Sequence, residues 1–230
     1  NYYFYEVGYR LATNNYSTAY NDSLGIEKLQ KYASLFGLNE RTGIEIEEAA
    51  PQIANEFPVM AAIGQSNNNY TTVQLARYVT AVANEGTVYQ YTLLNRLEDS
   101  DGNVLQTFEP QVRNQIDVLD TEEWNAIHSG MRMVVENTKE FDGFPIEAAG
   151  KTGTAQQNLK RPNHALFVGY APYDDPEISI ATRIAYGYTS HNAAKLARNV
   201  FAYYFNVENE DELLNGQAAN GNSSSNEISD

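Results

Sequence analysis

Three short segments rich in β-forming residues follow one another in the second half of the sequence. They cover Ala148–Gln156, Ala165–Tyr170 and Ile178–Tyr186. The connections between them are too short for the crossover that parallel pairing requires, so we expect antiparallel strands. A helical pattern over about residues 191–205 follows and should return to the sheet. The positions expected on its buried side are Ala193, Leu196, Ala197, Val200, Phe201 and Tyr204.

Helical periodicity dominates the sequence before these strands. It predicts helices at Tyr2–Ala12, at residues 24–38 with Gly37 near the end, from Thr71 to Gly86, and at Asp120–Asn137. Thr71 and Asp120 each precede a Gln or Glu by three positions, which is the capping-box pattern that opens a helix. The last of these helices should turn Trp124, Ile127, Met131, Val134 and Val135 toward the core.

Two further features complete the predicted architecture. Thr87–Leu97 and Val104–Val112 flank a Ser-Asp-Gly-Asn turn at residues 100–103, which predicts a hairpin. Residues 208–230 are mostly Asn, Ser, Gly and acids, so we expect a disordered polar tail after a domain spanning residues 1–207. The elements together predict an α+β fold in which an antiparallel sheet is flanked by helices.

Composition narrows the classes of partner. The formal net charge of −15 argues against nucleic acid or an anionic membrane surface, because both require clustered Lys and Arg. Without cysteine, and with three scattered histidines, the sequence predicts no metal site, and it suggests no cofactor. No apolar run approaches the roughly 20 residues that cross a bilayer. Because Asn1 opens directly onto a helical pattern, we expect the chain to be a fragment of a longer protein.

The segment richest in chemistry is Lys151-Thr152-Gly153-Thr154, set among small residues. In a regular strand, Lys151 and Gly153 would share one face, and the two threonines the other. Small side chains leave room for an extended ligand to pair with the strand backbone, while the lysine and hydroxyls could hold its carboxylate. The alternative interpretation is an edge strand that the lysine merely keeps soluble.

Lys-Thr-Gly belongs with Ser-x-x-Lys and Ser-x-Asn to the motif set of penicillin-binding proteins and class A β-lactamases. The sequence resembles the penicillin-binding transpeptidases also at Ala61–Arg77, at Asn84–Gly86 and at His164–Pro172. Ser66 departs from the family, where glycine is usual. The resemblance runs from Asn1 to about Phe205 and implies part of the fold shared by penicillin-binding proteins and serine β-lactamases.

The resemblance implies acyl transfer between peptidoglycan stem peptides that end in D-alanyl-D-alanine, through a serine acyl-enzyme that β-lactam antibiotics also form. Carried onto this sequence, Lys151, Thr152 and Thr154 would bind the terminal carboxylate, and Gly153 would allow close approach. The backbone N–H of Thr154 would supply half of an oxyanion hole. The family also implies a location on the outer face of the bacterial cytoplasmic membrane, with an anchor upstream of this fragment.

Two motifs of the set are not found in full. No serine has a lysine three positions later, so the nucleophile should lie in an upstream part of the same protein, which would also complete the fold. Ser-x-Asn occurs at Ser66, Ser190 and Ser224, and we reject all three on position. Asn1 matches the last residue of the family's Ser-x-Asn motif, although it could equally be an ordinary helix N-cap.

Other classes remain open. A penicillin-sensing domain without turnover, or a hydrolytic D,D-carboxypeptidase or serine β-lactamase, would use the same residues; Ala61–Arg77 favours the transpeptidase. The sequence argues against a phosphate-binding loop ending in Gly150-Lys151-Thr152, because the first glycine of that motif falls on Pro145. We expect His164 to be structural, and the Tyr2, Tyr3 and Tyr5 cluster to be packing.

Overall fold

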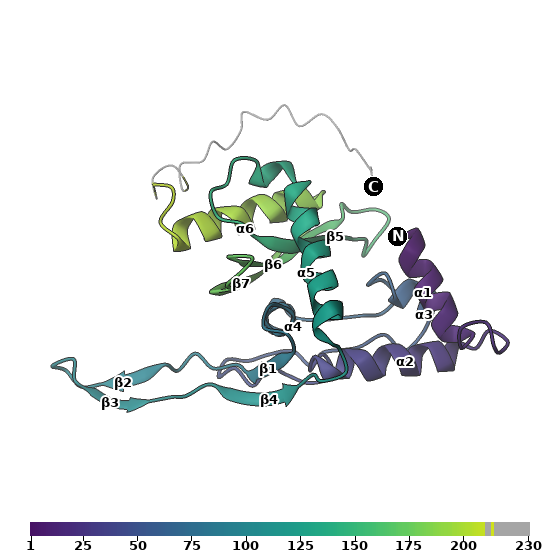
Figure 1. Cartoon of the computed structure of the whole chain (residues 1–230), viewed down its shortest axis with the longest axis horizontal. Coiled ribbons are helices and arrows are strands. Elements are labelled where there is room, and N and C mark those ends of the chain that lie inside the picture. Colours follow the sequence, from purple (N-terminus) through teal and green to yellow (C-terminus); the bar gives the residue numbers. More distant parts are fainter. Residues whose placement is uncertain (210–212, 214–230) are drawn as a thin grey trace. The chain divides into compact units, whose positions relative to one another are not determined.

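The computed structural model describes residues 1–209 and 213 and divides the chain into two compact units (Figure 1). The first unit comprises Asn1–Trp124 and the second begins at Asn125. Most of the predicted polar tail, residues 210–212 and 214–230, lies outside the described residues. The boundary predicted at residue 207 therefore stays a prediction.

Four helices build much of the first unit: α1 (Tyr2–Ala12), α2 (Asp22–Leu35), α3 (Pro58–Ala61) and α4 (Thr72–Ala83). The predicted bounds of α1 are confirmed. Helix α2 begins earlier than predicted, because the side chain of Asn21 accepts the Leu24 N–H at 3.3 Å and caps the first turn. Both bonds of the predicted capping box open α4.

The predicted hairpin consists of two short ladders in succession. Strands β1 (Thr87–Gln90) and β4 (Gln111–Gln115) pair antiparallel, and β2 (Arg96–Glu98) pairs with β3 (Val104–Thr107) beyond them. The turn adopts φ +83° at Gly102, as its sequence predicts. The continuous strands that we expected are interrupted between the two ladders, where the Tyr91 N–H donates to the Thr42 carbonyl and the Leu93 N–H to the Glu45 carboxylate. Register shifts after Val88 and after Leu97 also break the alternation inside β1 and β2.

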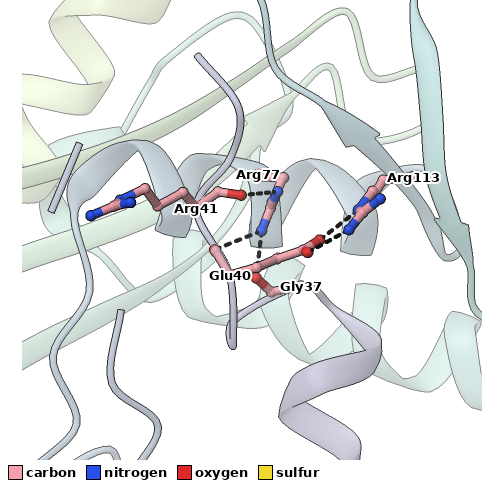
Figure 2. Close-up of polar contacts among 5 residues, drawn as sticks. All are labelled: Gly37, Glu40, Arg41, Arg77 and Arg113. Carbon is pink, nitrogen blue, oxygen red and sulfur yellow. Dashed lines mark hydrogen bonds and ion pairs between the residues drawn. The ribbon is translucent and has the colours of Figure 1, made fainter. Parts of the chain in front are cut away.

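A buried arginine ties α4 to the loop that follows α2 (Figure 2). The guanidinium of Arg77, which is 2% exposed, donates to the carbonyls of Gly37, Glu40 and Arg41, the latter two at 3.2 Å. Glu40 in turn accepts two bonds from Arg113 of β4, at 2.7 and 2.8 Å. Helix, loop and hairpin of the first unit are therefore joined through one polar cluster.

The second unit is a three-stranded sheet with helical cover. Helix α5 (Thr121–Glu136) leads into it and is followed by a short 3₁₀ turn, η1 (Lys139–Phe141). The strands β5 (Ala149–Ala155), β6 (His164–Ala171) and β7 (Ile178–Ile184) lie in that order and are antiparallel, as predicted. Helix α6 (Ser190–Tyr204) follows the last strand and runs along the sheet (Figure 1).

The core of this unit lies between α6 and one face of the sheet. Phe167 of β6 is fully buried against it, and Ala193, Ala197 and Phe201 of α6 are fully buried too. Our assignment of the helix face was partly wrong. Leu196, Val200 and Tyr204 are 45%, 38% and 49% exposed, because the alanines at 193, 194 and 197 let the helix backbone approach and turn the bulkier side chains outward.

The opposite face of the sheet also has a helical neighbour. The ring of His128 on α5 lies edge-on to that of Tyr170, with centroids 5.8 Å apart, so helices flank both faces as predicted. The core-facing stripe of α5 includes Trp124 and Val135, each 3% exposed, but not Ile127, which is 37% exposed. Ile127 is thus the one predicted core-facing residue of α5 that is exposed.

Candidate active site

The segment Lys151–Thr154 lies in the middle of β5, at the edge of the three-stranded sheet. Among the described strands β5 pairs with β6 alone, in an unbroken register from Ala149 opposite Tyr170 to Ala155 opposite His164. Its other edge therefore presents backbone N–H and C=O groups without a strand partner. An extended peptide or a peptide mimic could add to this edge as a further strand.

The regular register places the side chains as the sequence predicts. Thr152 lies opposite Phe167 and, with Thr154, shares the face that α6 covers. Lys151 lies opposite Val168 on the other face, where its side chain is exposed. Its ammonium donates to the carbonyl of Thr152 at 2.7 Å. The segment thus brings a cation, two hydroxyls and an open backbone edge within four consecutive residues.

Two glycines let Phe167 lie directly over the strand backbone. A Cβ at Gly150 would come within 2.3 Å of the Phe167 ring, and one at Gly169 within 2.7 Å. The ring also stacks on Phe141, with centroids 5.7 Å apart. Because Gly150 directly precedes Lys151, packing in the core sets the position of the strand that carries the candidate site.

His164, at the start of β6, is held in a structural role. Its Nδ1 accepts the Tyr186 backbone N–H at 3.1 Å, and its Nε2 lies 2.9 Å from the side-chain oxygen of Gln157. Burial, aided by the charge of Arg183, lowers the pKa of His164 below its ordinary value. Both ring nitrogens are therefore engaged in a neutral imidazole, which agrees with the predicted structural role.

Asn1 belongs to the first unit, so it is described separately from β5. It precedes α1, and its carbonyl accepts the Tyr5 N–H at 3.0 Å, while its side chain makes no capping bond. In the Ser-x-Asn match at Ser66, the side chains bond to the backbone of a neighbouring loop. Ser66 donates to the Glu56 carbonyl at 2.8 Å, and Asn68 accepts the Ala54 N–H at 2.8 Å.

The backbone of Ser66 adopts a conformation that favours glycine. Its φ is +66°, in the left-handed region that glycine adopts without strain. Its hydroxyl bond to Glu56 helps to hold that geometry.

Within residues 1–209 and 213, no cluster of three or more acidic or histidine side chains could bind a metal ion. In the same residues, no helix combines the length and the apolar character needed to cross a bilayer. The chemistry available at β5 is thus that of a cation, hydroxyls and backbone donors. Such a set can bind a carboxylate and polarise a carbonyl.

The model of the penicillin binding protein transpeptidase domain matches residues 6–202 of the chain. The chain belongs to this family. Its curated relatives include the peptidoglycan D,D-transpeptidase MrdA of Haemophilus influenzae, 33% identical over 83% of this chain and 34% of the relative. Penicillin-binding protein 2A of Bacillus subtilis is 26% identical over 86% of this chain and 31% of the relative.

Solved penicillin-binding proteins share the fold. Penicillin-binding protein 2B of Streptococcus pneumoniae superposes with a TM-score of 0.76 at 23% identity, covering 90% of this chain and 38% of that one. Penicillin-binding protein A of M. tuberculosis, solved as an imipenem acyl-enzyme complex, gives 0.72 at 21% identity, over 88% and 44%. The chain spans about a third of the length of the curated relatives it matches.

Sequence reasoning did not single out Arg183 as a neighbour of this site. The register aligns Gly153 of β5 with Leu166 of β6 and Leu166 with Arg183 of β7. Arg183 thus lies on the same face of the sheet as Lys151. That relation could not be read from spacing along the chain, because it depends on which residues of three strands stand opposite one another.

Proposed function

We propose that the protein containing this chain is a peptidoglycan D,D-transpeptidase that cross-links stem peptides ending in D-alanyl-D-alanine and is acylated by β-lactams. The observation that carries this proposal is the open edge of β5, with Lys151–Thr154 at its centre, in a chain of the transpeptidase family. The relative from Haemophilus influenzae, which is named a peptidoglycan D,D-transpeptidase, supports the same activity.

Each of the residues Lys151–Thr154 is assigned its own role in binding the donor peptide. The ammonium of Lys151 and the hydroxyls of Thr152 and Thr154 bind the terminal carboxylate of the donor peptide through charge-assisted hydrogen bonds. Gly153 lets the ligand backbone approach the strand. The N–H of Thr154 faces the carbonyl under attack and stabilises its developing negative charge.

The remaining catalytic groups are assigned outside β5. Asn1 is proposed as the asparagine of the Ser-x-Asn motif. The serine nucleophile and its lysine base are assigned to a part of the protein outside these 230 residues, since no Ser-x-x-Lys occurs in them. The same outlying part would complete the fold and carry a membrane anchor that places the domain on the outer face of the cytoplasmic membrane.

The decisive test uses the natural polypeptide that contains these residues and a fluorescent penicillin. Lys151→Ala should slow acylation roughly 10- to 100-fold, the value of one charge-assisted hydrogen bond. Stability should change by no more than about 0.5 kcal/mol, because the side chain is exposed. Lys195→Ala, at an exposed lysine of α6, is the matched control and should leave acylation unchanged.

Mass spectrometry of the labelled protein should place the adduct on a serine outside residues 1–230. An adduct on a serine within them would overturn the assignment of the nucleophile. An equal loss of acylation in the Lys151 and Lys195 variants would show that β5 is not part of the site.

The product distinguishes the transpeptidase from its rivals. Cross-linked dimers from a stem-peptide donor and an amine acceptor are expected. Free D-alanine without cross-linked product would indicate the D,D-carboxypeptidase, and rapid hydrolysis of the penicillin the serine β-lactamase. Acylation without any turnover of peptide would indicate the penicillin-sensing domain.

A further inference from the structure

Seven of the nine arginines in this chain have an evident electrostatic partner. Arg41 and Arg77 donate to backbone carbonyls. Five others form ion pairs with carboxylates, namely Arg10, Arg96, Arg113, Arg132 and Arg198. In the described part of the chain, Arg161 and Arg183 are the two whose guanidinium groups contact neither a carboxylate nor a carbonyl. Acidic residues outnumber basic ones by 30 to 15, so two arginines without a carboxylate or carbonyl partner require an explanation.

Both arginines belong to the end of the sheet where β5 finishes. Arg183 lies near the end of β7 on the Lys151 face, and Arg161 lies in the connection from β5 to β6. Both side chains are exposed. The acids of the unit that flank the strands, Glu147, Asp174, Asp175 and Glu177, are at the other end of the sheet. The three strands therefore carry opposite charge at their two ends.

Contacts through two aromatic rings, those of Tyr186 and His164, link the two guanidinium groups. Arg161 lies over the Tyr186 ring, 5.3 Å from its centroid, and donates to the Tyr186 hydroxyl at 2.7 Å. The Tyr186 ring lies 5.0 Å from that of His164, whose Nε2 is 3.4 Å from an Arg183 nitrogen. Tyr186 has φ +55°, a strained conformation that the surrounding contacts maintain.

This arrangement leaves charge and donors available to a ligand. A guanidinium stacked on an aromatic ring keeps its planar fork of N–H donors, which matches a carboxylate in two-point geometry. The neutral His164 between the arginines adds no competing charge, and ordering the arginines in advance lowers the entropic cost of binding. The two exposed arginines thus offer positive charge to an anion that arrives from the end of β5.

Resting on the proposed function of β5, we propose that Arg161 and Arg183 form a subsite for a second carboxylate of the acyl donor. A ligand with its terminal carboxylate at Lys151 and its reacting carbonyl at the N–H of Thr154 continues toward Ala155 and the connection that holds Arg161. A carboxylate borne on that continuing part comes into the field of both guanidinium groups, whose positive charges attract it together. The subsite therefore favours acyl donors with an acidic side group over neutral ones.

Two penicillins isolate this effect, because carbenicillin differs from benzylpenicillin by one side-chain carboxylate. In the natural polypeptide containing this chain, Arg161→Gln and Arg183→Gln should each lower the carbenicillin acylation rate about 5- to 10-fold, as loss of one exposed charge-assisted contact implies. Benzylpenicillin should stay within about twofold, because its reacting part is the same. Arg96→Gln, in the hairpin of the first unit, is the control and should alter neither rate.

An unchanged ratio of the two rates in both variants would overturn the subsite. An equal fall for both penicillins would also overturn it, since the arginines would then support the fold or the terminal carboxylate. Salt at about 0.5 M should lower the carbenicillin rate of the wild-type protein selectively, because exposed charges are screened at that ionic strength.

If neither penicillin acylates the wild-type protein, the proposed function fails and the subsite is judged by equilibrium binding. N-acetyl-D-glutamyl-D-alanyl-D-alanine and its D-glutaminyl analogue, measured by calorimetry, differ by one carboxylate. The acidic peptide should bind about fivefold more tightly, and either arginine variant should remove the difference. Equal affinities, or no binding of either peptide, would refute the subsite independently of acylation.

Discussion

Replacing Gly150 by alanine should distort the strand that carries the candidate site. The new Cβ would stand 2.3 Å from the Phe167 ring and 2.8 Å from the Val168 carbonyl oxygen, far inside van der Waals contact. Phe167 cannot withdraw freely, because it is fully buried and stacked on Phe141. We therefore expect a loss of about 3 kcal/mol in the free energy of unfolding, at the upper end of overpacking effects.

The measurement is chemical and thermal denaturation of the natural polypeptide, with hydrogen exchange read over β5 and β6. The loss should appear as a fall of roughly 6–12 °C in Tm for a domain of this size. Gly130→Ala is the matched control in the same unit, because nothing lies within 4 Å of the position in α5. Alanine there should stabilise the helix by about 0.5–1 kcal/mol, so the same substitution has opposite signs at two sites.

A double-mutant cycle tests the cause. Phe167→Ala alone should cost about 3–5 kcal/mol by leaving a cavity. Combined with Gly150→Ala it should cost less than the sum of the two losses, a coupling of about 2 kcal/mol, because the contact with the ring has gone and only that with the Val168 carbonyl remains. Additive losses would refute the contact between Gly150 and the ring, and an unchanged Tm in Gly150→Ala would refute it directly. The fraction of protein that remains folded should also react more slowly with penicillin, because Lys151 follows the displaced residue.

Three further outcomes follow from the described contacts. Arg77→Met should lower the free energy of unfolding by about 3 kcal/mol, because three backbone carbonyls lose their donor, that of Gly37 in a buried bond; an unchanged free energy of unfolding would contradict this. Glu85→Gly should raise stability by about 1 kcal/mol, since Glu85 has φ +58°, and a lower Tm would count against it. His164 has a lowered pKa in the folded state, so stability should be complete above about pH 6.5 and fall below it as the unfolded chain takes up the proton first. His164→Gln should flatten that fall, and an identical pH profile would exclude His164 as its source.

Much of the fold could be predicted from residues that lie close together in the sequence. The capping boxes at Thr71 and Asp120 open α4 and α5 as predicted, because each involves residues three apart. The turn at Gly102 and the antiparallel order of β5, β6 and β7 also follow from short segments and short connections. The regular alternation at Lys151–Thr154 needed only the strand itself, and the structure has it unbroken.

Features that depend on distant residues were misjudged or missed. The buried side of α6 could not be read from hydropathy, because the alanines that touch the sheet are less apolar than the exposed Leu196 and Val200. The interruption of the hairpin accompanies bonds from Tyr91 and Leu93 to Thr42 and Glu45, which are distant in the sequence. Arg161 and Arg183 were overlooked for a similar reason. The register of the strands places Arg183, and contacts with Tyr186 and His164 relate Arg161 to it, and neither is a sequence motif.

In β5, Gly150 serves packing and the adjacent Lys151 serves binding. Substitutions at the two positions should therefore have different effects. Gly150 faces the core, where any side chain would meet Phe167, whereas Lys151 is exposed on the other face of the sheet. A substitution at Gly150 should therefore lower stability and acylation together. A substitution at Lys151 should lower acylation alone, because the exposed ammonium acts on the ligand and not on the packing of the strand.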